Sequence, residues 1–302
     1  MELADLEYGL KSVSSAGHLL NFQELTSLQA ALTILRSSGT YDSIYLWGKI
    51  FGQQADYYIA YGLRHSEFEF PSKTFYVASE PKRVDGIALA DFAFRELPRL
   101  TEEVADRIMS LGLDNLFTGV ADFVIEPAAE LGPDQSPLTE LDRLSQVVQE
   151  IDFDTAVVPM GAYALNEARV VKAGRAPGLR SHLAKRQRLI DSVIPSLDFK
   201  GLGLTEAKSL SSYVHFRPPT SVACLRALAR TDIDFYSNFL DTLQDDLPKK
   251  CWACRQDASI SMVTLRSLSW PGYVAYHVPG STKFGGLYFG YGQKNGDLPF
   301  IL

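Results

Sequence analysis

Two cysteines, spaced as Cys251-Trp-Ala-Cys254, come closest in this sequence to a reactive motif. Such a pair could form a redox-active disulfide or supply half of a zinc site. A redox pair needs a helix start, where the dipole lowers the thiol pKa. The surrounding residues instead favour a strand, which would point the two sulfurs to opposite faces. A zinc site needs four ligands, and the only other thiol is Cys224. We therefore interpret both cysteines as partly buried side chains of a strand.

Histidines and glycines give no stronger candidate for chemistry. None of the five histidines pairs with another at metal-ligand spacing: His18, His65, His182, His215 and His277. The segment from Gly201 to Glu206 begins like a dinucleotide-binding fingerprint but has Glu206 where the third glycine belongs. Glycines at 285, 286, 290 and 292 could hold a phosphate, although bends among aromatic strands explain them better. The sequence thus predicts no catalytic, cofactor-binding or metal-binding residue. The alternative is an enzyme that uses the two thiols for redox chemistry or the glycine-rich tail for a nucleotide.

Composition narrows the class of protein further. The chain has 302 residues, is 46% hydrophobic and 22% charged, and carries a net charge of −7. These values are typical of a globular protein, and the acidic balance disfavours general binding to nucleic acid. No apolar run approaches the roughly 20 residues of a membrane span, and the acidic start lacks the features of a signal peptide. An odd number of cysteines fits a reducing compartment. We expect a cytoplasmic protein that binds neither nucleic acid nor membrane.

Strand-forming segments near both ends of the chain predict a sheet. Residues 41–63 read as a β-hairpin, residues 75–77 as a third strand, and residues 251–291 as a C-terminal meander. Amphipathic helices are predicted at 21–38, with Asn21 and Glu24 as a capping box, and over 222–245. This segregation predicts an α+β fold with a mixed or antiparallel sheet against the helices. We expect one domain over 1–302, with insertions at 80–150 and 165–199.

Shorter elements are predicted between these segments. Residues 97–111 and 137–148 have helical spacing, residues 205–213 suggest a short helix, and residues 155–159 suggest a buried strand. Leucines at 3, 6 and 10, with Val13, suggest a further helix before residue 21. Basic residues gather within 169–188, and aspartates between 232 and 246 would form the acidic side of a helix. Patches of opposite charge orient partners more than they supply affinity.

Aromatic residues are the best candidates for a partner interface, because tyrosine and tryptophan are enriched in such surfaces. Core burial is the default for any one of them, and Trp270 is expected to be largely buried at a strand end. We nevertheless predict an interface built from the hairpin and the meander: Trp47, Tyr57, Tyr58, Trp270, Tyr273 and Tyr276. The basic stretch would add an accessory contact through Arg180, Lys185, Arg186 and Arg188.

Several blocks of the sequence resemble the radial spoke head proteins of motile cilia and flagella. The hairpin block contains Trp47-Gly-Lys-Ile50 and Asp56-Tyr-Tyr-Ile-Ala60. Further matching blocks are Lys200–Lys208, His215–Arg217, Trp270-Pro-Gly272 and Gly290–Asn295. Together the blocks cover roughly residues 18–77, 150–163 and 200–302, whereas 80–150 and 165–199 match nothing we can place.

The resemblance implies a non-catalytic structural subunit of the axoneme. Proteins of this family build the spoke head, which meets the central-pair projections and relays mechanical signals to the dynein arms. The implied partners are other radial spoke head proteins and, directly or indirectly, the central-pair projections. A protein-binding adaptor outside the axoneme is the remaining alternative.

Overall fold

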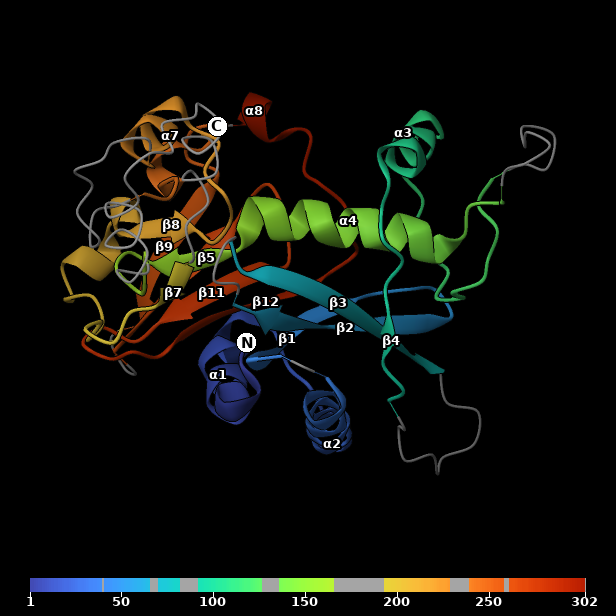
Figure 1. Cartoon of the computed structure of the whole chain (residues 1–302), viewed down its shortest axis with the longest axis horizontal. Coiled ribbons are helices and arrows are strands. Elements are labelled where there is room, and N and C mark those ends of the chain that lie inside the picture. Colours follow the sequence, from blue (N-terminus) through green and yellow to red (C-terminus); the bar gives the residue numbers. More distant parts are fainter. Residues whose placement is uncertain are drawn as a thin grey trace, which may run out of the picture.

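A mixed sheet of eight strands is the centre of the computed structural model, which describes residues 1–39, 41–65, 70–81, 92–126, 136–165, 193–228, 239–257 and 261–301. The strand order is β4-β3-β2-β1-β12-β11-β10-β9 (Figure 1). The N-terminal half consists of β1 (Ser43–Ile50), β2 (Ala55–Arg64), β3 (Ser72–Pro81) and β4 (Arg95–Glu96). The C-terminal half consists of β9 (Trp252–Asp257), β10 (Met262–Ser267), β11 (Tyr273–His277) and β12 (Phe284–Gly290). The predicted α+β class and the sharing of one sheet by hairpin and meander are confirmed.

The two halves of the sheet are joined by a parallel pairing of β1 with β12, while the other neighbours pair antiparallel. Gly48 makes this join possible. Its φ is 153°, and a Cβ atom placed there would lie 2.0 Å from the carbonyl oxygen of Tyr288. Any larger residue would push β1 away from β12. The glycine of the Trp-Gly-Lys block is therefore a requirement of close backbone approach.

A register shift next to Trp47 decides which side chains of β1 face which layer. Leu46 pairs with Ala60 and Gly48 with Ile59, so Trp47 is an extra residue in the ladder. The alternation of β1 side chains between the two faces of the sheet therefore shifts by one residue at this point. Before it, Leu46 faces one layer of the core, and after it Ile50 faces the other.

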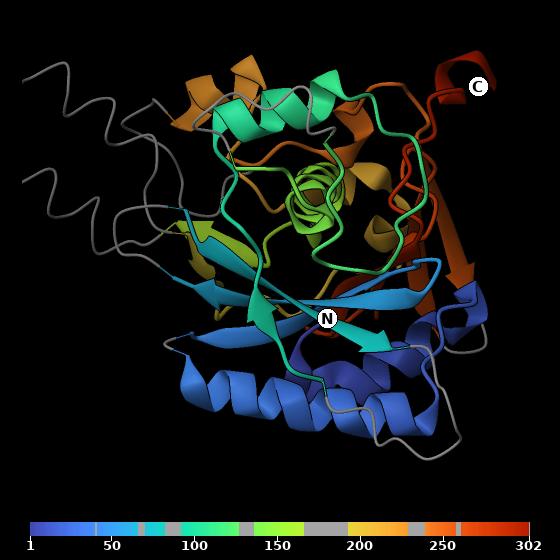
Figure 2. The ribbon, with the colours of Figure 1, turned by 90° about the vertical axis from the view of Figure 1, so that its right-hand side faces the viewer.

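Helices cover both faces of the sheet (Figures 1 and 2). On one face lies α4 (Glu140–Thr155), and on the other lie α1 (Leu6–Val13) and α2 (Phe22–Ser38). Residues of β11 alternate between the two cores: Tyr273 and Ala275 belong to the α4 side, whereas Val274 and Tyr276 belong to the side of α1 and α2. Met1 belongs to the core on the side of α1 and α2. Its amino group lies between β1 and β12, where it donates hydrogen bonds to the carbonyl oxygens of Leu46 and Gly286.

Local signals for helix ends account for α2 and α4. Asn21 and Glu24 form the predicted capping box of α2, with backbone-to-side-chain bonds of 2.7 and 2.8 Å. The helix predicted at 137–148 begins at Glu140, not at Pro137, because Thr139 and Asp142 form its capping box. Helix α4 supplies four buried side chains to the main core: Leu141, Leu144, Val148 and Ile151. The part of the predicted 80–150 insertion that forms α4 is therefore built into that core.

The other described elements connect these layers. They are η1 (Leu3–Asp5), η2 (Ser14–Ala16), α3 (Glu102–Ser110), β5 (Val157–Pro159), β6 (Tyr163–Leu165), β7 (Val193–Pro195), η5 (Glu206–Lys208), η6 (Leu210–Ser212), β8 (Tyr213–His215), α7 (Val222–Leu228), η7 (Leu243–Asp245) and α8 (Leu298–Ile301). Strands β5 and β8 form one small sheet, and β6 and β7 form another. The short helix predicted at 205–213 is instead two 3₁₀ turns. Among the described residues, no helix is both long and apolar enough to cross a membrane.

One helix prediction is wrong. Residues 222–228 are helical as α7, but the described residues 239–245 are not α-helical. Thr242 forms a bridge with Val214 of β8, and the carbonyl oxygen of Asp241 accepts a hydrogen bond from His215 N. Pairing with β8 thus replaces the local helical hydrogen bonds. Residues 229–238 lie outside the described residues.

Candidate functional site

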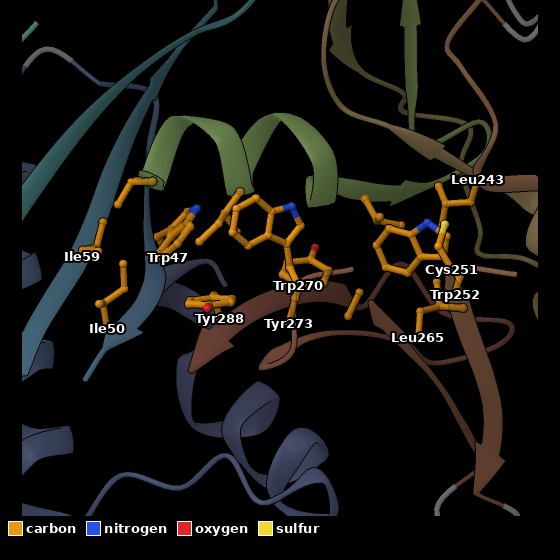
Figure 3. Close-up of a cluster of buried hydrophobic side chains, with 14 of the residues drawn as sticks. Trp47, Ile50, Ile59, Leu243, Cys251, Trp252, Leu265, Trp270, Tyr273 and Tyr288 are labelled. Atoms are coloured by element: carbon orange, nitrogen blue, oxygen red, sulfur yellow. The ribbon is translucent and has the colours of Figure 1, made fainter. Parts of the chain in front are cut away.

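The six aromatic residues predicted to form a partner interface are all buried within this chain. Their exposed fractions lie between 0% and 7% for Trp47, Tyr57, Tyr58, Trp270, Tyr273 and Tyr276. Figure 3 shows Trp47 and Trp270 between the sheet and α4, with Trp252 further along the same layer. Other parts of the chain cover these side chains, so a partner could reach them only if the fold opened. Their part in an interface stays a prediction.

A cleft of about 450 Å³ beside Trp270 gathers many of the polar residues from the family-like blocks. The indole nitrogen of Trp270 donates a hydrogen bond to Asp154 Oδ2 at 2.8 Å. Lys294 Nζ lies 2.9 Å from the same oxygen and 5.3 Å from the centre of the Trp270 ring. The end of α4 is thereby tied to β10–β11 and to the Gly290–Asn295 block. Trp270 is buried, as the sequence predicted.

Asp246, which also lines the cleft, repeats this arrangement with Trp252. Trp252 Nε1 donates to Asp246 Oδ2 at 2.7 Å, and His215 Nε2 lies 2.9 Å from both carboxylate oxygens. Because His215 is 1% exposed and its Nε2 is engaged, its geometry is that of an orienting partner for Asp246 rather than of a base open to substrate. In both arrangements the carboxylate holds a tryptophan in place.

The carboxylate of Asp241 is likewise engaged by other residues of the chain. Its carboxylate accepts hydrogen bonds from the backbone N–H groups of Thr220 and Ser221, and Arg217 lies 3.1 Å away. Burial by itself would raise the pKa of Asp241, but these hydrogen bonds lower it to about 2. The aspartate predicted for an exposed acidic helix is therefore buried and tied to the 217–221 turn. Arg180, Lys185, Arg186 and Arg188 lie outside the described residues, so their predicted contact is not tested.

Neither cysteine of the Cys-Trp-Ala-Cys segment has the properties of a nucleophile. Cys251 is buried, and burial together with the charge of Asp246 raises the pKa of its thiol to about 11. Burial also raises the pKa of Cys254, which belongs to β9 as predicted, and its Sγ lies 3.6 Å from the carbonyl oxygen of Lys208. Both thiols would be protonated at neutral pH, which disfavours thiol redox chemistry.

The glycines of the C-terminal tail make room for aromatic rings. A Cβ at Gly286 would lie 2.5 Å from the hydroxyl of Tyr273, and one at Gly290 would lie 2.6 Å from the hydroxyl of Tyr288. One at Gly292 would lie 2.9 Å from the ring of Phe117. Since the space beside these glycines is filled by rings, it is not available to cradle a phosphate. Among the residues described, no three His, Cys, Asp or Glu side chains gather as they would around a metal ion.

Glu140 is a buried residue that the sequence did not single out. It is 1% exposed and accepts hydrogen bonds from Tyr57 Oη, Thr118 N and Gly119 N at 2.7 to 2.8 Å. These donors hold the loop of residues 113–126 against α4. A glutamate in the first turn of a helix is usually exposed, because it interacts favourably with the helix dipole there. The anchoring role of Glu140 therefore becomes visible only from its hydrogen-bond donors, which lie far away in the sequence.

The fold and these polar clusters define an α+β protein built on one mixed sheet, whose tryptophans and carboxylates connect its layers. No protein-family model matches the chain. Proteins named radial spoke head protein 9 homolog are similar to it over the whole length of both chains. Identity is 31% over 312 aligned positions for the one from Homo sapiens, 30% over 310 for Bos taurus and 29% over 312 for Mus musculus. The chain belongs to the radial spoke head protein 9 family.

Proposed function

We propose that this protein is a non-catalytic structural subunit of the radial spoke head in the axoneme of motile cilia or flagella. It assembles there with other radial spoke head proteins. In that position it takes part in mechanical signalling between the central-pair projections, which it meets directly or through neighbours, and the dynein arms. The observation that carries this proposal is the full-length similarity to radial spoke head protein 9 homologs, including the 31% identity with the human protein.

The chemistry of the described residues supports a structural role. The charged residues that line the cleft beside Trp270 are engaged within the chain, as in the Asp154–Lys294, Asp246–His215 and Arg217–Asp241 pairs. The thiols are protonated at neutral pH, and aromatic rings occupy the space beside the tail glycines. These arrangements give no support to the redox or nucleotide-using alternatives.

Fractionation of cilia tests the proposal. The chain, labelled at its C-terminus, would be expressed in ciliated cells that lack their own radial spoke head protein 9. We expect it to stay with the microtubules after detergent extraction, to leave them with other spoke proteins in high salt, and to restore the beat. Release with the detergent-soluble proteins, without rescue of motility, would identify an adaptor outside the axoneme and contradict the proposal.

The basic stretch is proposed as an accessory contact in this assembly. Arg180, Lys185, Arg186 and Arg188 would steer association, and such steering weakens as salt screens charge. Replacing all four residues by glutamine should slow incorporation into the spoke in a salt-sensitive way and leave the melting temperature unchanged. Loss of incorporation at every salt concentration would show that the stretch provides the main contact instead.

A further inference from the structure

Large apolar side chains lie exposed on the loop of residues 113–126, at the end of the molecule that faces the viewer in Figure 2. In that view α4 is seen end-on, the loop surrounds it, and α3 lies above. Leu116, Val120, Phe123 and Val124 have exposed fractions of 39% to 48%. We call these four side chains the loop surface.

The loop is fixed by two buried charged residues of α4. Glu140 accepts hydrogen bonds from Thr118 N and Gly119 N, and Arg143 donates to the carbonyl oxygens of Leu113 and Asn115. The guanidinium of Arg143 also lies 4.5 Å from the centre of the Phe117 ring. The backbone N–H groups of Gln53 and Gln54 complete the attachment by donating to Phe117 O and Thr118 O.

A fixed loop that exposes large apolar groups is typical of a docking surface. Its backbone is already satisfied by α4 and by the β1–β2 turn, so the exposed side chains do not serve to fold it. Several large apolar groups that lie exposed on one short segment mark a site where another molecule binds. Because the loop is held in place before binding, little conformational entropy is lost on docking.

The charges around the loop surface indicate the chemistry of its occupant. Asp114 and Asp122 lie within the loop, and α3 contributes Glu102, Glu103 and Asp106 on its exposed side. Opposing them, Arg95 lies 3.9 Å from Asp122, and Arg107 is engaged by the buried Glu126. The surroundings of the apolar patch are therefore acidic, which favours a partner with basic residues at its edge.

We propose that the loop surface docks a segment of another protein in which apolar residues are flanked by lysine or arginine. This rests on the proposed assembly role, since it names the chemistry of one partner contact. An amphipathic helix or strand with a basic border would bury its apolar residues on Val120 and Phe123 and place its cations near Asp114 and Asp122.

Binding of a probe peptide to the full-length protein tests this. The probe is an amphipathic leucine–lysine peptide of about four helical turns, and its leucine–glutamate counterpart is the comparison. We expect Val120→Ser with Phe123→Ser to weaken binding of the lysine peptide about tenfold or more. Asp114→Asn with Asp122→Asn should weaken it at low salt. The control is Phe22→Ser with Ile34→Ser, which removes exposed apolar side chains of α2.

Three results would overturn the proposal: equal binding by the loop variants, an equal loss in the α2 control, or equal binding of the glutamate peptide. If the variant with serine at positions 120 and 123 failed to fold, the variant with asparagine at positions 114 and 122 would be used. Equal binding of the lysine peptide at low salt would then overturn the proposal. Adsorption of the wild type to zwitterionic lipid vesicles through Val120 and Phe123 would assign the surface to membranes and also overturn it. The two proposals can fail separately. If the proposed function is wrong, the protein is released from axonemes. If the docking proposal is wrong, the purified protein fails the peptide-binding test.

A photoreactive residue at position 123 tests the docking in cilia. We expect it to cross-link to an apolar segment with adjacent lysine or arginine in another spoke protein, and a photoreactive residue at position 34 should not yield that product. A cross-link to a second copy of this chain, or to an acidic segment, would contradict the proposed occupant.

Discussion

Trp270 and Asp154, 116 residues apart in the sequence, are joined by a hydrogen bond of 2.8 Å from the indole nitrogen to the carboxylate. The bond ties the turn after β10 to the last turn of α4. The Trp-Pro-Gly block therefore connects two layers of the fold through a polar partner beside a core tryptophan.

Removing Trp270 should lower the free energy of unfolding more than removing Asp154. Trp270→Ala should cost ~3–5 kcal/mol, because a large aromatic side chain leaves a cavity. Asp154→Ala should cost ~1–3 kcal/mol, because the indole N–H loses its acceptor. Lys294→Gln is the control and should cost below ~1 kcal/mol, since that ion pair is largely exposed. Urea unfolding of the three variants measures these differences, and a wild-type value for Trp270→Ala would contradict the assigned burial.

Gly48→Ala should destabilise the protein by ~2 kcal/mol or more, since the new Cβ would collide with the carbonyl oxygen of Tyr288 and would require a positive φ. Gly296→Ala is the matched control, because nothing lies within 4 Å of a Cβ built there. Thermal melts of both variants test this. Equal melting temperatures would show that β1 and β12 do not approach as described.

Glu140→Gln should loosen the loop that carries Thr118 and Gly119. An amide offers only one oxygen, so at least one of the three donors loses its acceptor, at a cost of ~1–3 kcal/mol. Hydrogen exchange at the amides of Thr118 and Gly119 should accelerate, while exchange in β11 changes little. Glu103→Gln, an exposed residue at the start of α3, is the control. Unchanged exchange in the Glu140 variant would refute the anchoring role.

Stability should fall as the pH drops below about 6.5, partly because of His277. Its Nε2 accepts a hydrogen bond from Leu202 N at 3.1 Å, so the folded state holds the neutral ring. Burial lowers the pKa of His277 in the folded protein. As the pH falls, His277 therefore takes up a proton more readily in the unfolded chain than in the folded chain. The stability that is present above pH 6.5 is lost as the pH falls towards the pKa of His277 in the folded protein.

The measurement for His277 is urea unfolding at several pH values between about 5 and 7.5. His277→Gln should reduce the pH dependence in this window, and His65→Gln serves as the control. A variant at position 277 with the full wild-type pH dependence would show that other groups cause it.

Alkylation tests the state of the thiols. At pH 7.5, Cys251 should react with iodoacetamide far more slowly in the folded protein than in urea, because it is buried and its pKa is raised to about 11. Mass spectrometry of the modified peptides distinguishes it from Cys224 and Cys254. Rapid modification of Cys251 in the folded state would revive the redox alternative.

Local patterns in the sequence determined much of the fold. Period-two alternation and β-branched residues indicated the strands, and Asn21 with Glu24 marked the start of α2. Such signals work because secondary structure and capping depend on residues a few positions apart. The burial of Trp270 was also predictable, since a large aromatic side chain next to a strand end has few alternatives to the core.

Tertiary structure alone decided the long-range strand pairing and the burial of several side chains. The parallel pairing of β1 with β12 and the burial of Glu140 depend on partners far away in the sequence. The same applies to Tyr57 and Tyr58, which alternation places on opposite faces of β2 and which helices on both faces then cover. Whether an aromatic side chain is core or interface depends on what lies over it. That is set by long-range packing, which no local pattern encodes.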